Sequence, residues 1–154
     1  MNLTRRSISA TVLALSLGLG ACADNMSKPE ASLYQRLGGK DAITAVVDDF
    51  VGNVAGDNRI NKFFARADIS RLKRNLVDQI CSASGGPCTY TGRDMGQTHD
   101  GMAVTAGEFD ALVEDLVATL DEFEVPKAEQ EELLGLLAPM RGDIVEQRRM
   151  GGGY

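Results

Sequence analysis

The chain of 154 residues contains no tryptophan, a single histidine, three cysteines, five phenylalanines and three tyrosines. One histidine excludes a zinc site built from several imidazoles and any catalytic scheme that needs two of them. Positive charge is also scarce, because 16 Lys and Arg stand against 22 Asp and Glu and leave a net charge of −6. This charge disfavours general electrostatic binding to nucleic acid, and no basic stripe compensates for it, so we expect no nucleic-acid partner.

The residues that are present suffice for one folded domain. Hydrophobic residues make up 44% of the chain and charged residues 25%, a balance typical of globular proteins that argues against collagen, long disorder or a repeat array. With so few aromatic residues, the core must consist mainly of Leu, Val, Ile, Ala and Met side chains.

Residues 1–21 have the pattern of a secretory signal peptide. Arg5 and Arg6 precede an apolar run that contains no acidic residue and is too short for a membrane-spanning helix, which needs roughly 20 apolar residues. The segment ends in Leu-Gly-Ala-Cys, which resembles the bacterial lipobox, where the cysteine accepts diacylglycerol before cleavage. Cys22 would then be the lipidated first residue. An ordinary signal peptide followed by a free cysteine is the alternative.

Cleavage before Cys22 would leave a lipid-anchored chain. Alanine rather than aspartate follows this cysteine, and by resemblance to sorted lipoproteins this favours the periplasmic face of a bacterial outer membrane. Residues 22–31 are polar and predict a short tether, whereas residues 149–154 predict a flexible tail.

Between residues 32 and 148 apolar residues recur at intervals of three and four, which predicts an all-α domain. We expect Asp41 to cap the second helix and Pro139 to kink the last one, while Thr105 and Glu108 have the spacing of a capping box. Residues 85–104 are too rich in glycine to predict a helix. The predicted helices cover residues 33–37, 41–56, 69–83, 105–120 and 126–145.

The only histidine, His99, lies in this irregular segment. Met95 and Met102 flank it with soft apolar side chains, which suit a flat hydrophobic cofactor. Haem iron needs one strong protein ligand, so one imidazole suffices, and the absence of a Cys-x-x-Cys-His motif excludes covalent c-type attachment. A surface or hydrogen-bonded histidine is the alternative interpretation.

Short motifs over residues 33–145 resemble those of the group 1 truncated haemoglobins in order and spacing. This resemblance implies a two-over-two helical sandwich, a shortened globin in which the segment before the iron ligand is mostly loop. It also implies a haem b cofactor and the binding of dioxygen, carbon monoxide or nitric oxide. The matching motifs are LYQRLGG at 33–39, DF at 49–50, KFF at 62–64, SRLK at 70–73, GGP at 85–87, YTG at 90–92, Met95, QTH at 97–99 and VP at 125–126.

The resemblance assigns roles to individual residues. His99 corresponds to the proximal iron ligand, with its second ring nitrogen held by a backbone carbonyl, and Phe64 to the aromatic side chain that packs on the haem face. The resemblance places nine further residues along the implied haem slot. Taken alone, each of them is equally consistent with an ordinary core position. These residues are Leu72, Met95, Met102, Val104, Phe109, Leu112, Leu116, Leu137 and Met140.

The residues that would face the bound gas depart from the family pattern. Many members have a tyrosine and a glutamine that donate hydrogen bonds to bound dioxygen, whereas this chain has Val51, Leu72 and Leu76 there. Such a bond is worth roughly 1.5–3 kcal/mol, so we expect an apolar distal pocket that releases dioxygen quickly. Gln79 lies on the same helical face one turn further on and is the alternative donor. Ile80 stands where relatives have a phenylalanine near an apolar tunnel.

Cys81 and Cys88 form an even pair once Cys22 is lipidated, and an oxidising periplasm predicts a disulfide between them. Closing a loop of this size would stabilise the fold by roughly 2.5 kcal/mol. Two buried free thiols are the alternative. A catalytic cysteine is disfavoured because the one histidine has another role.

Together these observations predict a lipid-anchored haem b protein that binds a diatomic gas. One alternative is a gas-sensing or haem-carrying module that acts through a partner. Another is an enzyme for nitric oxide dioxygenation or peroxide turnover that receives electrons from an unidentified reductase, although the apolar distal residues disfavour efficient versions. A third is a structural lipoprotein without haem.

Overall fold

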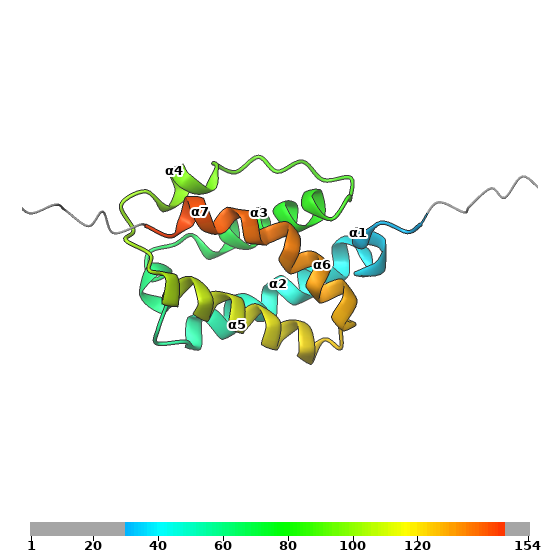
Figure 1. Ribbon diagram of the computed structural model, residues 1–154, viewed down its shortest axis with the longest axis horizontal. Coiled ribbons are helices and arrows are strands. Elements are labelled where there is room, and N and C mark those ends of the chain that lie inside the picture. Colours follow the sequence, from blue (N-terminus) through cyan, green and yellow to red (C-terminus); the bar gives the residue numbers. More distant parts are fainter. Residues whose placement is uncertain (1–29, 147–154) are drawn as a thin grey trace, which may run out of the picture.

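The computed structural model describes residues 30–146, which form helices and contain no strand (Figure 1). The predicted signal peptide at residues 1–21, the lipidation site Cys22, most of the tether and the tail at 149–154 lie outside these described residues. Between residues 30 and 146 no helix is both long and apolar enough to cross a membrane.

The helices form the two-over-two sandwich, so the predicted all-α fold is confirmed. The central helix α2 packs against α3 and against α5, while the short helix α4 packs against α7. In Figure 1, α1 and α4 lie at opposite ends of the molecule. The elements are α1 (Leu33–Arg36), α2 (Gly39–Gly56), a 3-10 turn η1 (Asn61–Phe63), α3 (Ile69–Ala83), α4 (Met95–His99), α5 (Ala106–Glu122), α6 (Lys127–Leu137), a second 3-10 turn η2 (Ala138–Met140) and α7 (Arg141–Ile144).

The core is built around α2, which has the broadest apolar face. Its buried side chains are Ile43, Val46, Val47, Phe50, Val51 and Val54. Each fully buried side chain of this kind contributes roughly 1.5–3 kcal/mol relative to exposure. In α3 only Val77, Ile80 and Cys81 are buried, whereas Leu72 and Leu76 are half-buried. An apolar face of α3 is therefore left partly uncovered.

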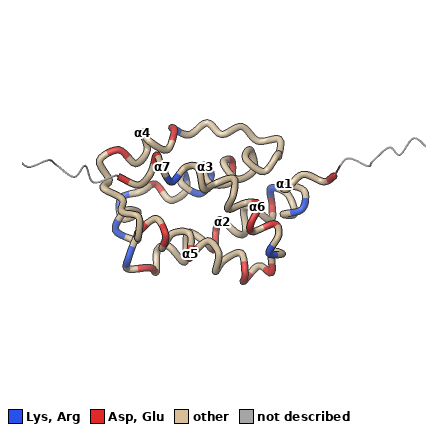
Figure 2. Tube along the Cα trace, in the orientation of Figure 1, with Lys and Arg blue, Asp and Glu red and all other residues tan. Residues whose placement is uncertain are grey.

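Charged residues of both signs are interspersed over the described part of the chain (Figure 2). Some pair across helices: Arg36 of α1 contacts Glu129 and Glu132 of α6, and Lys40 of α2 contacts Asp78 of α3. Pairs with this exposure contribute at most about 1 kcal/mol each. They orient helices whose packing is already determined by the apolar core.

The prediction that Asp41 caps the second helix is wrong. The N-cap is Gly38, whose φ of +91° is a left-handed conformation that glycine adopts without strain, and α2 begins at Gly39. Asp41 lies in the first turn, where its charge still favours the helix N-terminus. The left-handed glycine lets α1 turn directly into α2, so the helix begins two residues before the aspartate.

The structure also contains a helix that the sequence did not predict. Residues 95–99 form α4, capped by the Asp94 carboxylate, which accepts a hydrogen bond from the Gln97 N–H at 2.8 Å. At the C-terminal end, Pro139 interrupts the predicted last helix, so α6 ends at Leu137 and η2 leads into α7. The capping box of Thr105 and Glu108 at the start of α5 is confirmed.

Candidate functional site

A cavity of about 490 Å³ borders the uncovered face of α3. Side chains from α2, α4, α5, α6 and α7 complete its walls, and its volume lies within the roughly 300–1,000 Å³ typical of small-molecule and cofactor sites. Eight of the residues that the sequence predicted along a haem slot line this cavity. They are Phe64, Leu72, Met95, Phe109, Leu112, Leu116, Leu137 and Met140.

Two predicted residues, Met102 and Val104, do not line the cavity. Met102 follows α4 in a turn, where its N–H donates to the His99 carbonyl at 3.0 Å. Val104 is buried, and its carbonyl accepts a hydrogen bond from the Glu146 N–H at 2.9 Å. Met102 thus closes the turn after α4, Val104 connects the segment before α5 to the end of α7, and neither lines the cavity.

His99 is the last residue of α4 and lines the cavity. Its Nδ1 lies 2.8 Å from the Met95 carbonyl oxygen one turn earlier, so Nδ1 carries the proton and donates it to that carbonyl. Nε2 is then the basic nitrogen with a free lone pair. Because the cap of α4 and this hydrogen bond orient the ring, the site offers one oriented nitrogen ligand.

The wall formed by α2 and α3 is apolar where the sequence predicted the gas to bind. Val51, Leu72 and Leu76 all line the cavity, and none of their side chains can donate a hydrogen bond. Leu72 and Leu76 lie four residues apart on one face of α3 because apolar spacing along this helix follows its period. Phe50 extends the same apolar surface from α2.

Gln79 also lines the cavity, further along α3. Its amide Nε2 lies 3.0 Å from the Met140 sulfur and 3.9 Å from the Met95 sulfur, so it reaches towards η2 and α4. Thioether sulfur is a weak acceptor, which leaves the amide with poor partners. Gln79 lies eight positions beyond Arg71, which places it about 12 Å further along the helix.

Arginines form the solvent-facing edge of the cavity. Arg71 and Arg93 line it, are exposed and have no ion-pair partner among residues 30–146. Arg141 also lines it, but its guanidinium pairs with Asp110 and lies 4.8 Å from the centre of the Phe109 ring. Two of the three cations are thus available for an anionic ligand. Neither arginine was predicted as a site residue from the sequence, although Arg71 is part of the SRLK motif at 70–73.

Tyr90 contributes a further polar group to the lining. Its hydroxyl donates to the Arg93 carbonyl at 2.8 Å and closes a short loop just before α4. Burial raises the pKa of the Tyr90 phenol, and the nearby Asp94 charge raises it further. The hydroxyl is therefore a neutral donor at physiological pH, and Tyr90 stabilises the approach to His99.

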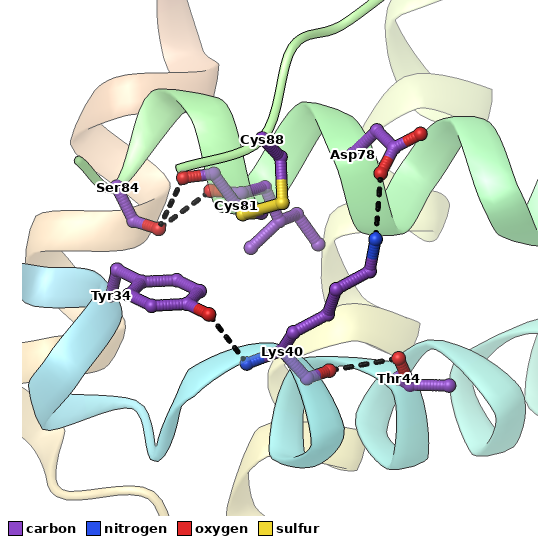
Figure 3. The surroundings of a disulfide bond; sticks show 8 residues. Tyr34, Lys40, Thr44, Asp78, Cys81, Ser84 and Cys88 are labelled. Atoms are coloured by element: carbon purple, nitrogen blue, oxygen red, sulfur yellow. Dashed lines mark hydrogen bonds and ion pairs between the residues drawn. A yellow bond between two sulfur atoms is a disulfide. The ribbon is translucent and has the colours of Figure 1, made fainter. Parts of the chain in front are cut away.

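Cys81 and Cys88 are joined in a disulfide with their Cα atoms 5.7 Å apart (Figure 3). Cys81 is fully buried at the end of α3, and Cys88 lies in the segment that leads to α4. Figure 3 shows Tyr34 and Ser84 beside the bridge, and the Tyr34 N–H donates to the Ser84 carbonyl at 2.9 Å. The bridge thus lies where α1, α3 and this segment meet.

The composition of the cavity indicates the kind of group it suits. Among residues 30–146 no cluster of three or more His, Cys, Asp or Glu side chains could hold a bare metal ion. A single oriented imidazole in an apolar hollow, with guanidinium groups at the edge, suits a flat apolar cofactor that brings its own metal ligands and carries carboxylates. The site residues therefore fit haem.

Comparisons with known proteins agree with this geometry. The model of the bacterial-like globin family matches residues 32–146. A group 1 truncated haemoglobin of Mycolicibacterium paratuberculosis is 36% identical over 114 residues, which cover 74% of this chain and 84% of the relative. A group 1 truncated haemoglobin of Synechocystis is 35% identical over 77% of this chain and 95% of the relative.

Solved structures show the same similarity. The iron(III) form of the truncated haemoglobin from Tetrahymena pyriformis superposes with a TM-score of 0.73 at 32% identity, over 76% of this chain and all of that one. The 2/2 haemoglobin of a Synechococcus species, a cyanomet form with covalently attached haem, has a TM-score of 0.71 at 33% identity over the same shares. The similarity covers the helical domain and the cavity.

Proposed function

The chain belongs to the bacterial-like globin family and its group 1 truncated haemoglobins, and from this premise we propose that it binds one haem b in the cavity through His99 and takes up a diatomic gas. Membership of the family supports haem and gas binding. The observation that carries the proposal is the hydrogen bond from His99 Nδ1 to the Met95 carbonyl, because it leaves Nε2 free inside the cavity. Haem supplies an iron atom that coordinates this nitrogen and the gas.

On the proximal side the chain orients the ligand and excludes water. The carbonyl of Met95 selects the tautomer of His99 and raises the basicity of its other nitrogen. Apolar side chains line the cavity that His99 borders, which lowers the local dielectric and limits the access of water. These side chains include Leu112, Leu116, Leu137 and Met140.

On the distal side the three residues predicted to face the gas supply no hydrogen-bond donor, whereas Asn75 and Gln79 of α3 line the same cavity with amide groups. Val51, Leu72 and Leu76 contribute only hydrocarbon, so a gas that gains negative charge receives no stabilising donor from them. Carbon monoxide gains less from such a donor than dioxygen does, so the pocket favours carbon monoxide relative to dioxygen. The Gln79 amide reaches towards the sulfur atoms of Met95 and Met140, which are weak acceptors, so Gln79 stays the alternative donor to the gas.

At the edge of the cavity Arg71 and Arg93 are the groups that would hold the two carboxylates of haem. Each is exposed, lines the cavity and lacks an ion-pair partner among the described residues. Bidentate hydrogen bonds between guanidinium and carboxylate add both energy and orientation. Arg141 is less suited because Asp110 already neutralises it.

Visible absorption spectra of the purified chain with haem, oxidised, reduced and with carbon monoxide, test the proposal. We expect a five-coordinate ferrous form that binds carbon monoxide readily, because the chain has no second imidazole. His99→Ala should abolish tight haem uptake or alter the ferrous spectrum. The control Met102→Leu changes a neighbour that does not line the cavity and should leave the spectrum unchanged. An unaltered ferrous spectrum in His99→Ala contradicts the ligand assignment.

We also propose that the chain is anchored to the periplasmic face of the outer membrane through a lipidated Cys22. The basic start, the short apolar run and the lipobox-like end of residues 1–21 support this proposal. In a bacterial host Cys22→Ser should leave an unlipidated precursor of higher mass, whereas the native chain should fractionate with membranes. Processing of the serine variant to the same mature length, with neither the native chain nor the variant fractionating with membranes, would argue for an ordinary signal peptide.

A further inference from the structure

The segment between α3 and α4 is attached to the domain mainly at its beginning. The Gly86 N–H donates to the Cys81 carbonyl at 2.8 Å, and the Ser84 hydroxyl donates to the Ile80 carbonyl at 2.6 Å. Cys88 is bonded to Cys81, which is fully buried among the residues of the core. Residues 84–88 are therefore tied to the end of α3 by hydrogen bonds and by one covalent bond.

Beyond Cys88 the hydrogen bonds of the segment are local. Tyr90 bonds to the Arg93 carbonyl, the Asp94 cap serves α4 itself, and the Thr98 hydroxyl donates to the Asp94 carbonyl at 2.8 Å. Between residues 30 and 146 the only polar contact from residues 89–99 to α1, α2 or α3 is the weak one from Gln79 to the Met95 sulfur. The main packing partner of α4 is α7, and not α1, α2 or α3.

We propose that the Cys81–Cys88 bridge is a thiol-sensitive clamp on the segment that carries His99, so that its reduction weakens the hold of the chain on haem. The proposal rests on the proposed function, in which haem is bound at His99. With the bridge closed, the segment starts from a fixed point on the buried end of α3. With the bridge open, more conformations are accessible to residues 87–94, and haem binding must then order them.

The reaction is an ordinary exchange with a dithiol reductant. A thiolate of the reductant attacks the sulfur of Cys88, which is partly exposed, and the sulfur of the fully buried Cys81 leaves as a thiolate that takes up a proton. The second thiol of the reductant then attacks the mixed disulfide and releases Cys88. The protein gains two electrons and two protons, and the reductant becomes a disulfide.

The test measures the rate at which haem transfers to an excess of apomyoglobin. We expect transfer from the native chain to be about tenfold faster after treatment with dithiothreitol. The effect is smaller than the full loop-closure entropy would give, because only part of that entropy acts on haem binding. The double variant Cys81→Ser/Cys88→Ser should transfer haem at the fast rate with and without the reductant. A reductant effect on this variant would instead mean that dithiothreitol acts on the haem, and this overturns the clamp.

Lys40→Met is the matched control. It removes the ion pair between Lys40 and Asp78 beside the bridge without opening it (Figure 3). This variant should transfer haem at the native rate and respond to dithiothreitol as the native chain does. If Lys40→Met and the double serine variant accelerate haem loss equally, the bridge acts only through general stability and the clamp is refuted.

Amide hydrogen exchange separates a failed clamp from a failed haem assignment. Opening the bridge should increase exchange in residues 89–99 at least several-fold while leaving α2 and α5 unchanged. A chain that takes up no haem in either redox state contradicts the proposed function. The exchange pattern then still tests whether the bridge restrains residues 89–99. Haem uptake with equal transfer rates in both redox states overturns the clamp and leaves the proposed function standing.

Discussion

The two walls of the cavity are built in opposite ways. The distal wall consists of long helices, α2 and α3, whose apolar side chains pack against each other. The part of the proximal wall that carries His99 is the five-residue helix α4 at the end of an irregular segment. A cap, local hydrogen bonds and packing against α7 hold this helix, and a disulfide holds the start of the segment. The comparison shows that repeated packing secures one wall and a few specific local contacts secure the other.

The difference in how the two walls are held together matters for function, because the two walls have different roles in the proposed haem site. The distal wall must exclude water and offer a space, which interchangeable apolar side chains can do. The proximal wall must orient one nitrogen, and orientation depends on individual hydrogen bonds such as that from His99 to the Met95 carbonyl. Single substitutions should therefore have larger structural effects on the proximal side.

The largest effect is expected for glycine-to-alanine changes in the two walls. In the proximal segment, a Cβ on Gly86 would lie 2.5 Å from the Tyr34 ring and 2.8 Å from the Cys81 carbonyl. Gly86→Ala should therefore lower the free energy of unfolding by about 2–3 kcal/mol. Gly52 in α2 has no atom within 4 Å of such a Cβ, so Gly52→Ala should raise that free energy by up to about 1 kcal/mol. Urea denaturation measures the free energy of unfolding of both variants. Equal changes in the two variants would contradict the difference between the walls.

The next effect concerns the distal wall, where Val51→Tyr places a hydroxyl donor in the apolar pocket. The rate of dioxygen dissociation should fall about tenfold or more, the equivalent of one charge-assisted hydrogen bond. Val51→Phe is the matched control, because it adds the ring without the hydroxyl. Stopped-flow measurements of the dioxygen dissociation rate of the native chain and of both variants test this prediction. If native dissociation is already slow and the tyrosine changes nothing, Gln79 or another group supplies the donor.

Removing the cap of α4 should have a smaller effect. Asp94→Ala deletes the acceptor of the Gln97 N–H and should destabilise the helix that carries His99 by about 1 kcal/mol. We expect faster haem transfer to apomyoglobin by up to about fivefold, because 1 kcal/mol corresponds to that ratio. Asp94→Asn keeps a capping oxygen and should behave like the native chain. A transfer rate unchanged in the alanine variant would show that packing on α7 alone positions α4.

The smallest effect lies outside both walls, at the start of α5. The hydrogen bond from Lys62 and then those from the N–H and hydroxyl of Thr105 lower the pKa of Glu108 from 4.5 to about 2. Its ionised form therefore stabilises the fold above pH 4.5, and this contribution is lost as the pH falls from about 4.5 to about 2. Thermal unfolding of Glu108→Gln over this range should show a flatter acid limb than the native chain. Parallel curves for the two proteins would contradict this assignment.

The distal wall could be predicted because its information is local and repeated. Apolar spacing predicted the third helix with Leu72 and Leu76 on its apolar face, and both residues line the cavity. The capping box at Thr105 was equally visible. The prediction for Asp41 failed because a polar residue suited to a cap lies inside the first turn of a helix whose N-cap is Gly38.

The proximal wall was harder to predict because its helix is shorter than the window in which a period can be recognised. α4 depends on one cap and on packing against α7, some 40 residues further along the chain. Met102 and Val104 were expected to line the slot from their places along the sequence, but the Met102 N–H bonds within the turn after α4 and the Val104 carbonyl bonds to the Glu146 N–H beyond α7. The edge arginines became apparent only when the chain brought Arg71 and Arg93 to one cavity.

The amino-acid sequence by itself determined the helical class, the single imidazole and the absence of polar side chains at positions 51, 72 and 76, because composition and helical period are properties of neighbouring residues. The tertiary structure alone decided that Nδ1 of His99 bonds to the Met95 carbonyl, that Arg71 and Arg93 gather at the edge of the cavity and that residues 95–99 form a helix packed on α7. These features depend on contacts between residues distant in the chain or on the direction of one side chain, and the burial of the core determines both.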